Sequence, residues 1–329
     1  MRVCILGDAS PPHDEGMKKV TWSLATALSA RTEVLTLNPL RAATLDFWRQ
    51  LRRFGPDIVH YVPGPSLKSF LLLAAVKRRT AAYTVLSLTH PDPAMPRRLA
   101  CRFLQPDLVL TQSAHWEQLF KAAGCRNLQF VPNGVDTARF KPATPDEKRA
   151  LRQKYELSPD AFIVLHVGNT RTVRQLDVLP RLRQAGCEVI VVSSTTIRGD
   201  GEMDDRLTQA GCRIWNHYIE AVEEVYALAD CYVFPLAQGV GAIEHPLSVI
   251  EAMATNLPVI TRRFGALPRT FSPGDGLYFV DLDDEIVHTV QSIRDHRPPV
   301  ATCEKARALD WERIADRLLE LYQATERGQ

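Results

Sequence analysis

Disulfide and zinc-binding patterns are missing from this sequence of 329 residues. Its seven cysteines are scattered, their number is odd, and no Cys-x-x-Cys spacing occurs. A disulfide framework or a structural zinc site is therefore not expected. We expect buried free thiols in a reducing compartment.

Long apolar segments are also missing. The longest candidate run covers residues 70–76, far short of the about 20 residues that a membrane-spanning helix needs. The opening letters, MRVCILGD, enter a short apolar run directly, without the longer apolar region and small-residue cleavage site of a secretory signal. The sequence therefore favours a cytoplasmic protein without membrane spans.

Acidic residues are scarce in the first part of the chain. Residues 1–142 contain 19 lysines and arginines against 10 acids, whereas the remainder contains 21 against 28. The net charge of +2 thus combines a basic part with an acidic part. A basic part of this kind can meet an anionic partner. The sequence shows no basic and aromatic stacking platform, which argues against nucleic acid as that partner.

Short apolar runs alternate with amphipathic stretches in the first half. Alternation of this kind indicates a parallel sheet covered by helices on both faces. The predicted strands cover 2–7, 32–37, 58–61, 84–88, 108–111 and 128–131, and the predicted helices cover 20–29, 45–54, 67–77 and 114–123.

The same alternation restarts after a linker at 137–145 that contains two prolines. The strands predicted there cover 162–167, 189–192, 213–215, 231–234 and 258–261, and the helices cover 173–184, 221–228 and 247–254. We therefore predict an α/β protein of two Rossmann-like βαβ domains, at 1–142 and 143–329, facing each other across a cleft. A long amphipathic helix at about 303–323 is expected to pack back on the N-terminal domain.

A polar loop with two prolines follows the first strand, and Gly16 stands just before the next helix. Glycine there lets backbone amides approach a phosphate at the helix N-terminus, where the helix dipole favours negative charge. The loop lacks the G-x-G-x-x-G spacing of dinucleotide-binding folds. An ordinary strand-to-helix turn fits the pattern equally well.

Arg171 and Arg174 flank a predicted helix start, shortly after a buried strand that ends near Gly168. Guanidinium groups and backbone amides together can clamp a diphosphate. Solvated arginines on a helix surface are the alternative.

Two glutamates stand in the segment 241–254. Glu251 is surrounded by apolar neighbours, and a buried acid in such a helix needs a partner, for which the paired hydroxyls of a ribose would be suitable. An exposed helix glutamate is the alternative. Glu244 is expected in the preceding loop, because Pro246 suits the first turn of the helix.

The order of these pieces resembles the family 4 retaining glycosyltransferases of the GT-B fold, in the group 1 glycosyltransferase superfamily. The resemblance covers nearly the whole chain. The segments that carry it are PDIVHYVPGP at 56–65, PDLVLTQSAHWEQLFKAAGCRNLQFVPNGVDTARFKP at 106–142, VLHVGN at 164–169, LADCYVFP at 228–235, and PLSVIEAMATNLPVITRRFGALP at 246–268.

The resemblance implies a nucleotide-sugar donor, bound mainly by the C-terminal domain, and an acceptor received by the N-terminal domain. Its implied roles are catalytic for His90 and Glu244, diphosphate binding for Gly16, Asn169, Arg171 and Arg174, contact with the donor sugar for His245, Pro246, Leu247 and Ser248, ribose binding for Glu251, and nucleobase binding for Tyr218 and Ile219. A capping or core histidine is the alternative for His90.

The sequence departs from the family pattern at two places. Asn169 replaces the usual arginine after Gly168, and Arg171 can compensate from the same loop. The family's first glutamate would align at Ile243, so Glu244 comes one residue late and His245-Pro246 replaces the usual Phe-Gly. These changes affect the loop that normally contacts the donor sugar.

The resemblance implies transfer with retention at the anomeric carbon and without a metal or other cofactor, because no Asp-x-Asp stands where a donor diphosphate could use it. UDP- or GDP-sugars are the expected donors, and the acceptor is a small molecule, a glycan or a lipid-linked molecule. The basic N-terminal domain could rest on the inner, anionic face of a membrane, with a solvated basic surface as the alternative. A non-catalytic GT-B subunit, a two-lobed solute-binding protein and a GT-B sugar epimerase are the rival functions.

Overall fold

The computed structural model describes residues 1–197, 199–237 and 242–326. The chain divides into two compact units. The first unit comprises Met1–Gly134, Ile243–His245 and Trp311–Gln329, and the second comprises Val135–Ala242 and Pro246–Asp310. The first division thus falls after Gly134, whereas the sequence prediction placed it after Pro142. In addition, two later segments of the chain belong to the first unit.

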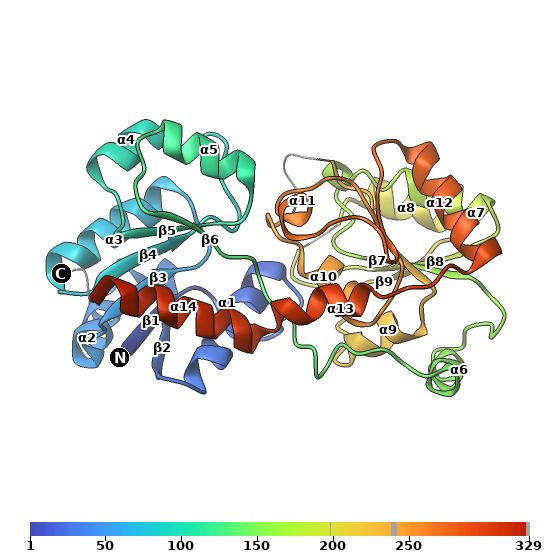
Figure 1. The fold of residues 1–329 in the computed structure, drawn as a ribbon, viewed down its shortest axis with the longest axis horizontal. Helices are drawn as coiled ribbons and strands as arrows, with labels where there is room; N and C mark the ends of the chain where they lie inside the picture. Colours follow the sequence, from blue (N-terminus) through green and yellow to red (C-terminus); the bar gives the residue numbers. More distant parts are fainter. Residues whose placement is uncertain (198, 238–241, 327–329) are drawn as a thin grey trace. The chain divides into compact units, whose positions relative to one another are not determined.

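The first unit is built on a six-stranded parallel sheet in the order β2-β1-β3-β4-β5-β6 (Figure 1). Strand β1 lies between β2 and β3, where Cys4 pairs with Leu35 on one side and with Val59 on the other. The strands are β1 (Arg2–Leu6), β2 (Glu33–Leu37), β3 (Ile58–Tyr61), β4 (Tyr83–Ser87), β5 (Leu108–Thr111) and β6 (Leu128–Phe130). The helices are α1 (Gly16–Ser29), η1 (Pro39–Arg41), α2 (Leu45–Phe54), α3 (Leu67–Arg79), α4 (Arg97–Phe103), α5 (Ala114–Ala122) and α14 (Trp311–Glu326).

The second unit repeats this plan with a six-stranded parallel sheet in the order β12-β11-β10-β7-β8-β9. The strands are β7 (Ile163–Val167), β8 (Glu188–Val192), β9 (Arg213–Trp215), β10 (Cys231–Phe234), β11 (Val259–Thr261) and β12 (Leu277–Phe279). The helices are α6 (Pro145–Lys154), η2 (Thr172–Arg174), α7 (Val178–Gln184), α8 (Gly201–Gln209), α9 (Val222–Leu228), α10 (Leu247–Ala254), α11 (Leu267–Thr270), α12 (Asp283–His296), α13 (Thr302–Ala306) and η3 (Arg307–Leu309).

The strands at the centre of each sheet are buried because their apolar residues run without polar alternation. All four residues of β3, β5 and β10 are buried, as expected for parallel strands that are covered on both faces. The predicted fold class of two Rossmann-like units is confirmed. In such sheets, the loops at the carboxyl ends of the strands are the place where ligands bind.

The last helix, α14, packs on the first unit, where it lies beside α1 (Figure 1). An ion pair joins Arg31, just beyond α1, to Asp316 of α14. The fully buried Tyr322 places its hydroxyl 2.7 Å from Nδ1 of His60 on β3. The other ring nitrogen of His60 lies 2.7 Å from the Ser87 hydroxyl. A buried hydrogen-bonded chain therefore ties α14 to two strands of the sheet.

Histidine burial predicts acid sensitivity of folding. Burial lowers the pKa of His60 to about 3, and burial together with the charge of Arg174 lowers the pKa of His166 to about 3. An unfolded histidine takes up its proton near pH 6.5. The unfolded state therefore binds more protons at mildly acidic pH, and stability is lost as the pH falls from about 6.5 toward 3.

We expect the free energy of unfolding to fall by about 1.4 kcal/mol per pH unit for each of these histidines below pH 6. Urea unfolding between pH 5 and pH 7 measures this slope. His60→Asn, which cannot be protonated there, should flatten the slope by about that amount relative to the unsubstituted protein. An equal slope in the two proteins would show that His60 does not cause the acid sensitivity.

Candidate functional site

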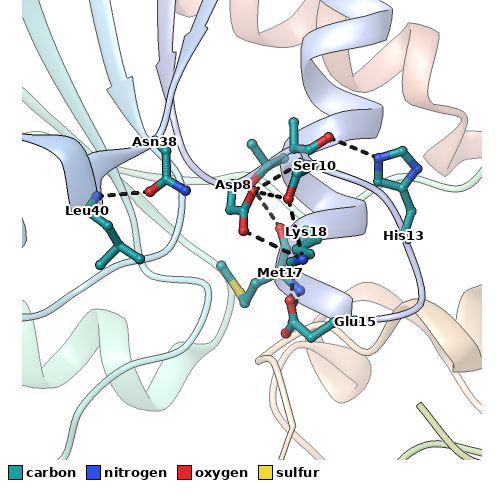
Figure 2. Close-up of polar contacts among 10 residues, drawn as sticks. Asp8, Ser10, His13, Glu15, Met17, Lys18, Asn38 and Leu40 are labelled. Atoms are coloured by element: carbon teal, nitrogen blue, oxygen red, sulfur yellow. Dashed lines mark hydrogen bonds and ion pairs between the residues drawn. The ribbon is translucent and has the colours of Figure 1, made fainter. Parts of the chain in front are cut away.

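The loop between β1 and α1 is held by its own polar side chains. Figure 2 shows Asp8 beside Ser10 and Lys18. One carboxylate oxygen of Asp8 accepts hydrogen bonds from the Ser10 amide at 3.0 Å and from the Ser10 hydroxyl at 2.7 Å. The Lys18 ammonium lies 3.7 Å from the other oxygen. The loop is therefore fixed at the carboxyl end of β1, where the sequence predicted a ligand.

Glu15 caps the N-terminus of α1 next to Gly16. Its carboxylate accepts hydrogen bonds from the amides of Met17 and Lys18 at 3.0 and 2.9 Å (Figure 2). These are amides that the sequence prediction offered to a donor phosphate. In this structure they bind the chain's own carboxylate instead, so a phosphate at Gly16 would have to displace Glu15 or use other donors.

The segment Ile243–His245 belongs to the first unit and brings Glu244 to His90. The amide of Glu244 donates to the carbonyl of Thr89 at 2.8 Å. The Trp116 indole donates to Oε1 of Glu244 at 3.2 Å. A Cβ added to Gly16 would lie 3.5 Å from the Ile243 side chain. The first unit therefore gathers three predicted site residues, Gly16, His90 and Glu244, from distant parts of the chain.

Burial raises the pKa of the Glu244 carboxyl above its ordinary value. Hydrogen bonds from Ser113 and Trp116, and the positive charges that His115 and His90 can carry, act in the opposite direction. Only 7% of Glu244 is exposed, whereas His90 and His115 are exposed at the surface. A carboxyl group of this kind can accept a hydrogen bond, and it takes up a proton at a higher pH than an exposed glutamate does.

His245 is fully buried and is held by Asn133. The Asn133 amide donates to Nδ1 of His245 at 3.0 Å, and the Asn133 side-chain nitrogen donates to the His245 carbonyl at 2.9 Å. Nδ1 is therefore the acceptor, and the neutral ring carries its proton on Nε2. Burial lowers the pKa of His245 to about 4. The Asn-Gly segment of the sequence resemblance thus anchors this loop.

In the second unit, the predicted diphosphate residues follow β7. Asn169 accepts the amide of Arg171 at 3.3 Å, so its side chain shapes the loop. Arg171 itself is exposed. Arg174 is buried, and a Cβ at position 168 would lie 2.0 Å from its Nη2 atom. Gly168 is therefore required for the guanidinium to pass this close to the backbone.

Arg174 lies among aromatic groups of the sheet. Its guanidinium carbon is 5.6 Å from the centre of the Phe234 ring. Burial lowers the pKa of Arg174 to about 10, with Tyr232 acting in the opposite direction. The side chain remains cationic at neutral pH. A desolvated cation at the carboxyl end of a parallel strand is suited to a phosphate ligand.

Glu251 lies on α10 and is buried at 4% exposure. The Tyr226 hydroxyl donates to its Oε2 at 3.0 Å. Tyr232, on β10, interacts electrostatically with both Arg174 and Glu251 and forms a hydrogen bond with Ser248. Because β10 and β7 are neighbouring strands, the predicted ribose and diphosphate residues converge at one edge of this sheet.

The remaining predicted residues of the second unit differ in exposure. Tyr218 is half exposed and Ile219 is partly buried, in the segment after β9. Pro246 and Leu247 are buried, and Ser248 is partly buried near Tyr232. Nothing in these positions assigns them to a nucleobase or a sugar, so those roles stay predictions.

The sequence prediction missed several residues that surround the candidate site residues in each unit. In the first unit these are Ser113, Trp116 and Asn133, and in the second they are His166, Tyr226 and Tyr232. Tyrosine within the otherwise apolar run CYVF was a usable signal, because a buried hydroxyl needs a hydrogen-bond partner.

Within 1–197, 199–237 and 242–326, no group of three or more acidic, histidine or cysteine side chains could hold a metal ion. Over the same ranges, every helix is too short or too polar to cross a bilayer.

The sequence comparisons point to one enzyme group. Residues 161–295 match the family model described as Glycosyl transferases group 1. The chain is 25% identical over 240 residues to sulfoquinovosyl transferase SQD2 of Arabidopsis thaliana, covering 67% of this chain and 45% of the relative. It is 24% identical over 288 residues to the GDP-mannose-dependent monoacylated alpha-(1-6)-phosphatidylinositol monomannoside mannosyltransferase of Corynebacterium glutamicum, covering 78% of this chain and 74% of the relative. The chain spans about half the length of most curated relatives that it matches.

The structural comparison supports the same fold. HepE of Anabaena, solved in complex with UDP and glucose, superposes with a TM-score of 0.75 at 15% identity, covering 98% of this chain and 99% of that one. Two Rossmann-like units with parallel sheets are the architecture of the GT-B class. Residues 161–295 of this chain, in the second unit, are the part that matches the group 1 glycosyltransferase model. The resemblance to group 1 glycosyltransferases that the sequence motifs indicated is confirmed.

Proposed function

We propose that the protein is a retaining glycosyltransferase that takes a nucleotide-sugar donor and needs no metal ion. The observation that carries this proposal is the convergence of Arg174 and Glu251 around Tyr232, at neighbouring strands of the second unit. The match of residues 161–295 to group 1 glycosyltransferases supports it. In the proposed complex Glu251 accepts hydrogen bonds from the ribose hydroxyls, and Arg174 faces the diphosphate.

The proposed reaction breaks the bond between the anomeric carbon and the diphosphate oxygen, and forms a bond from the same carbon to an acceptor hydroxyl oxygen. The acceptor proton passes to a phosphate oxygen of the departing diphosphate. Negative charge that develops on the leaving group is stabilised by Arg174, by Arg171 and by backbone amides of the loop after β7. One well-placed group of this kind contributes about 3–4 kcal/mol in enzymes.

UDP- and GDP-sugars are the first donors to test, because HepE was solved with UDP and the Corynebacterium relative is named for GDP-mannose. A thermal-shift panel of UDP-, GDP-, ADP- and dTDP-sugars is expected to give one nucleotide that raises the melting temperature. Ligand binding to the folded state alone produces such a rise. No shift with any nucleotide or nucleotide sugar at millimolar concentration would refute the proposal.

Activity is expected to survive chelation. The guanidinium groups of Arg171 and Arg174 supply the positive charge that a metal ion provides in other transferases. The rate at which the nucleotide diphosphate is released from the matched donor in about 5 mM EDTA should equal the rate in buffer without EDTA. Loss of turnover in EDTA that Mg²⁺ or Mn²⁺ restores would contradict the prediction.

A non-catalytic GT-B subunit is the second candidate function. It is favoured by Ile243 at the position of the family's first glutamate, with Glu244 bound to Thr89 and Trp116 of the first unit instead. Such a subunit would bind the nucleotide sugar but would not consume it. Consumption of the donor by the purified protein excludes this candidate.

We also propose that the basic first unit rests on an anionic membrane surface through α4. Leu99 and Phe103 are 56% and 64% exposed on this helix, and the exposed Arg98 and Arg102 stand next to them. The basic end of α3 is less available, because Lys77 pairs with Asp107 and Arg79 stacks on Trp48. A lipid-linked acceptor would fit such a surface, and the name of the Corynebacterium relative contains one, a monoacylated phosphatidylinositol monomannoside.

Co-sedimentation with liposomes tests the membrane proposal. Binding is expected to rise with the fraction of anionic lipid and to fall with salt, with each basic residue near the surface worth about 1 kcal/mol. The double substitution of Arg98 and Arg102 by serine should weaken binding more than Lys77→Ser does. The absence of binding to anionic vesicles at low salt would refute membrane contact.

A further inference from the structure

The position of one carboxylate in the first unit, that of Glu244, is not explained by the proposed binding of the donor to the second unit. Glu244 comes one residue after Ile243, where the family's first glutamate would align. Its backbone and its side chain are both held by the first unit. The amide donates to Thr89, just beyond β4, and Oε1 accepts from the indole of Trp116 on α5. Ser113, the N-cap of α5, adds a hydrogen bond to the same carboxylate.

The groups around Glu244 come from the segments that follow β4 and β5. His90 follows β4, and Ser113, His115 and Trp116 follow β5. The rings of His115 and Trp116 meet edge to face at 5.5 Å, and the guanidinium of Arg97 on α4 lies 5.6 Å from the Trp116 ring centre. His90, His115 and Arg97 are the charged or titratable groups that face this carboxylate or its indole partner.

This combination is suited to an uncharged, hydroxyl-rich ring. A carboxylate and a histidine nitrogen can accept hydrogen bonds from hydroxyl groups, whereas a phosphate would be repelled by Glu244. The neighbouring indole and imidazole rings offer apolar surface to the carbon face of such a ring. The backbone of Glu244 is fixed at Thr89, so the carboxylate is positioned before any ligand arrives.

The geometry points to Glu244 as an acceptor-binding residue that accepts a hydrogen bond from a hydroxyl group of a sugar or cyclitol ring, with Trp116 and Ser113 as its positioning residues. This inference rests on the proposed glycosyl transfer and deepens it, because it names the substrate class that the first unit takes. It also gives a reason for the one-residue displacement from Ile243: the carboxylate serves the acceptor and not the donor sugar.

The test uses the full-length protein and UDP-glucose as the probe, or the nucleotide sugar that the thermal-shift panel selects. Binding of this donor and release of its nucleotide diphosphate are measured separately, with water alone and with added myo-inositol or methyl glucoside as surrogate acceptors. Glu244→Gln keeps the shape of the side chain but removes its charge. The donor dissociation constant of this variant is expected to stay within about threefold of the value for the unsubstituted protein. Its rate of nucleotide diphosphate release is expected to be at least about tenfold lower.

The pH profile of release separates a direct role from a structural one. Release is expected to fall on the acid side as Glu244 takes up a proton, and this limb should disappear in Glu244→Gln but persist in His115→Gln. Trp116→Phe removes a hydrogen bond that stabilises the carboxylate, so it should move the limb to higher pH. If the Trp116 indole has only a structural role, Trp116→Phe would change the rate of diphosphate release without shifting the acid limb of the pH profile.

Two results would overturn the inference. One is a loss of donor binding in Glu244→Gln as large as that in Glu251→Gln, which would make Glu244 a donor ligand. The other is an unchanged release rate and pH profile in Glu244→Gln. If the unsubstituted protein binds no nucleotide sugar, the proposed function fails instead, and the two failures are therefore distinguishable.

Discussion

Replacing Glu251 by glutamine is expected to weaken binding of the donor nucleotide at least about 100-fold. The physical reason is the loss of one of two hydrogen bonds from the ribose hydroxyls, together with the loss of the charge that strengthens the other; a hydrogen bond to a charged acceptor is worth about 1.5–3 kcal/mol. Glutamine has the same length but offers only one oxygen, and its amide nitrogen cannot accept a hydrogen bond. Isothermal titration with the nucleotide that the thermal-shift panel selects measures the change directly.

Two further variants make this result specific. Tyr226→Phe removes the 3.0 Å hydrogen bond to Oε2 of Glu251 but leaves the carboxylate, so a smaller loss of affinity is expected. Glu202→Gln changes an exposed acid in the first turn of α8 and should leave affinity unchanged. Urea unfolding checks that each variant is folded. Donor affinity in a folded Glu251→Gln protein that equals the original would remove Glu251 from the site.

Replacing Arg174 by methionine is expected to lower kcat/KM for the donor by more than tenfold, and by as much as about 100-fold. Methionine fills most of the space beside Phe234, so the principal loss is the positive charge facing the diphosphate. A factor of ten corresponds to about 1.4 kcal/mol, less than one well-placed electrostatic contact supplies in a transition state. Steady-state kinetics over a range of donor concentrations separates the effect on kcat from that on KM.

Arg174→Lys is the matched control, because it retains the charge and restores the residue type that the family resemblance places there. It should keep most of the activity, with a modest loss from the missing bidentate geometry. Equal and severe losses in the lysine and methionine variants would show that Arg174 supports the fold beneath Gly168 and does not act on the diphosphate.

The strands were predictable from the sequence because parallel strands covered on both faces leave a continuous apolar run. Helix α6 was missed, since 137–145 was interpreted as a linker. A local signal was present: Thr144 and Glu147 form a capping box, and Pro145 occupies the first turn. The predicted helix at 173–184 is interrupted, because Gln175 adopts a φ of 54° and α7 begins only at Val178.

The residues that we propose for the donor could be selected from the sequence in the second unit, whereas the surroundings of the candidate residues in the first unit could not. Arg174 and Glu251 stand close in sequence to the strands that position them, so motif and periodicity could find them. The partners of Glu244 are more than 100 residues away in the sequence, at Thr89 and Trp116. No local pattern in a single sequence encodes such a contact. The cap formed by Glu15 was likewise invisible as a competitor for phosphate, because a glutamate before a helix does not reveal which amides it will bind.

Because α14 completes the first unit, the order of synthesis and the order of folding differ. A ribosome has finished every strand and helix of the second unit by Asp310, before any of Trp311–Glu326 has emerged. Until then His60 lacks the Tyr322 hydroxyl, and the apolar surface beneath Ile314 and Leu318 is uncovered. The first unit, most of which is translated first, can therefore complete its fold only after the second unit has been synthesised. A nascent chain stalled before α14 would expose that surface to chaperones.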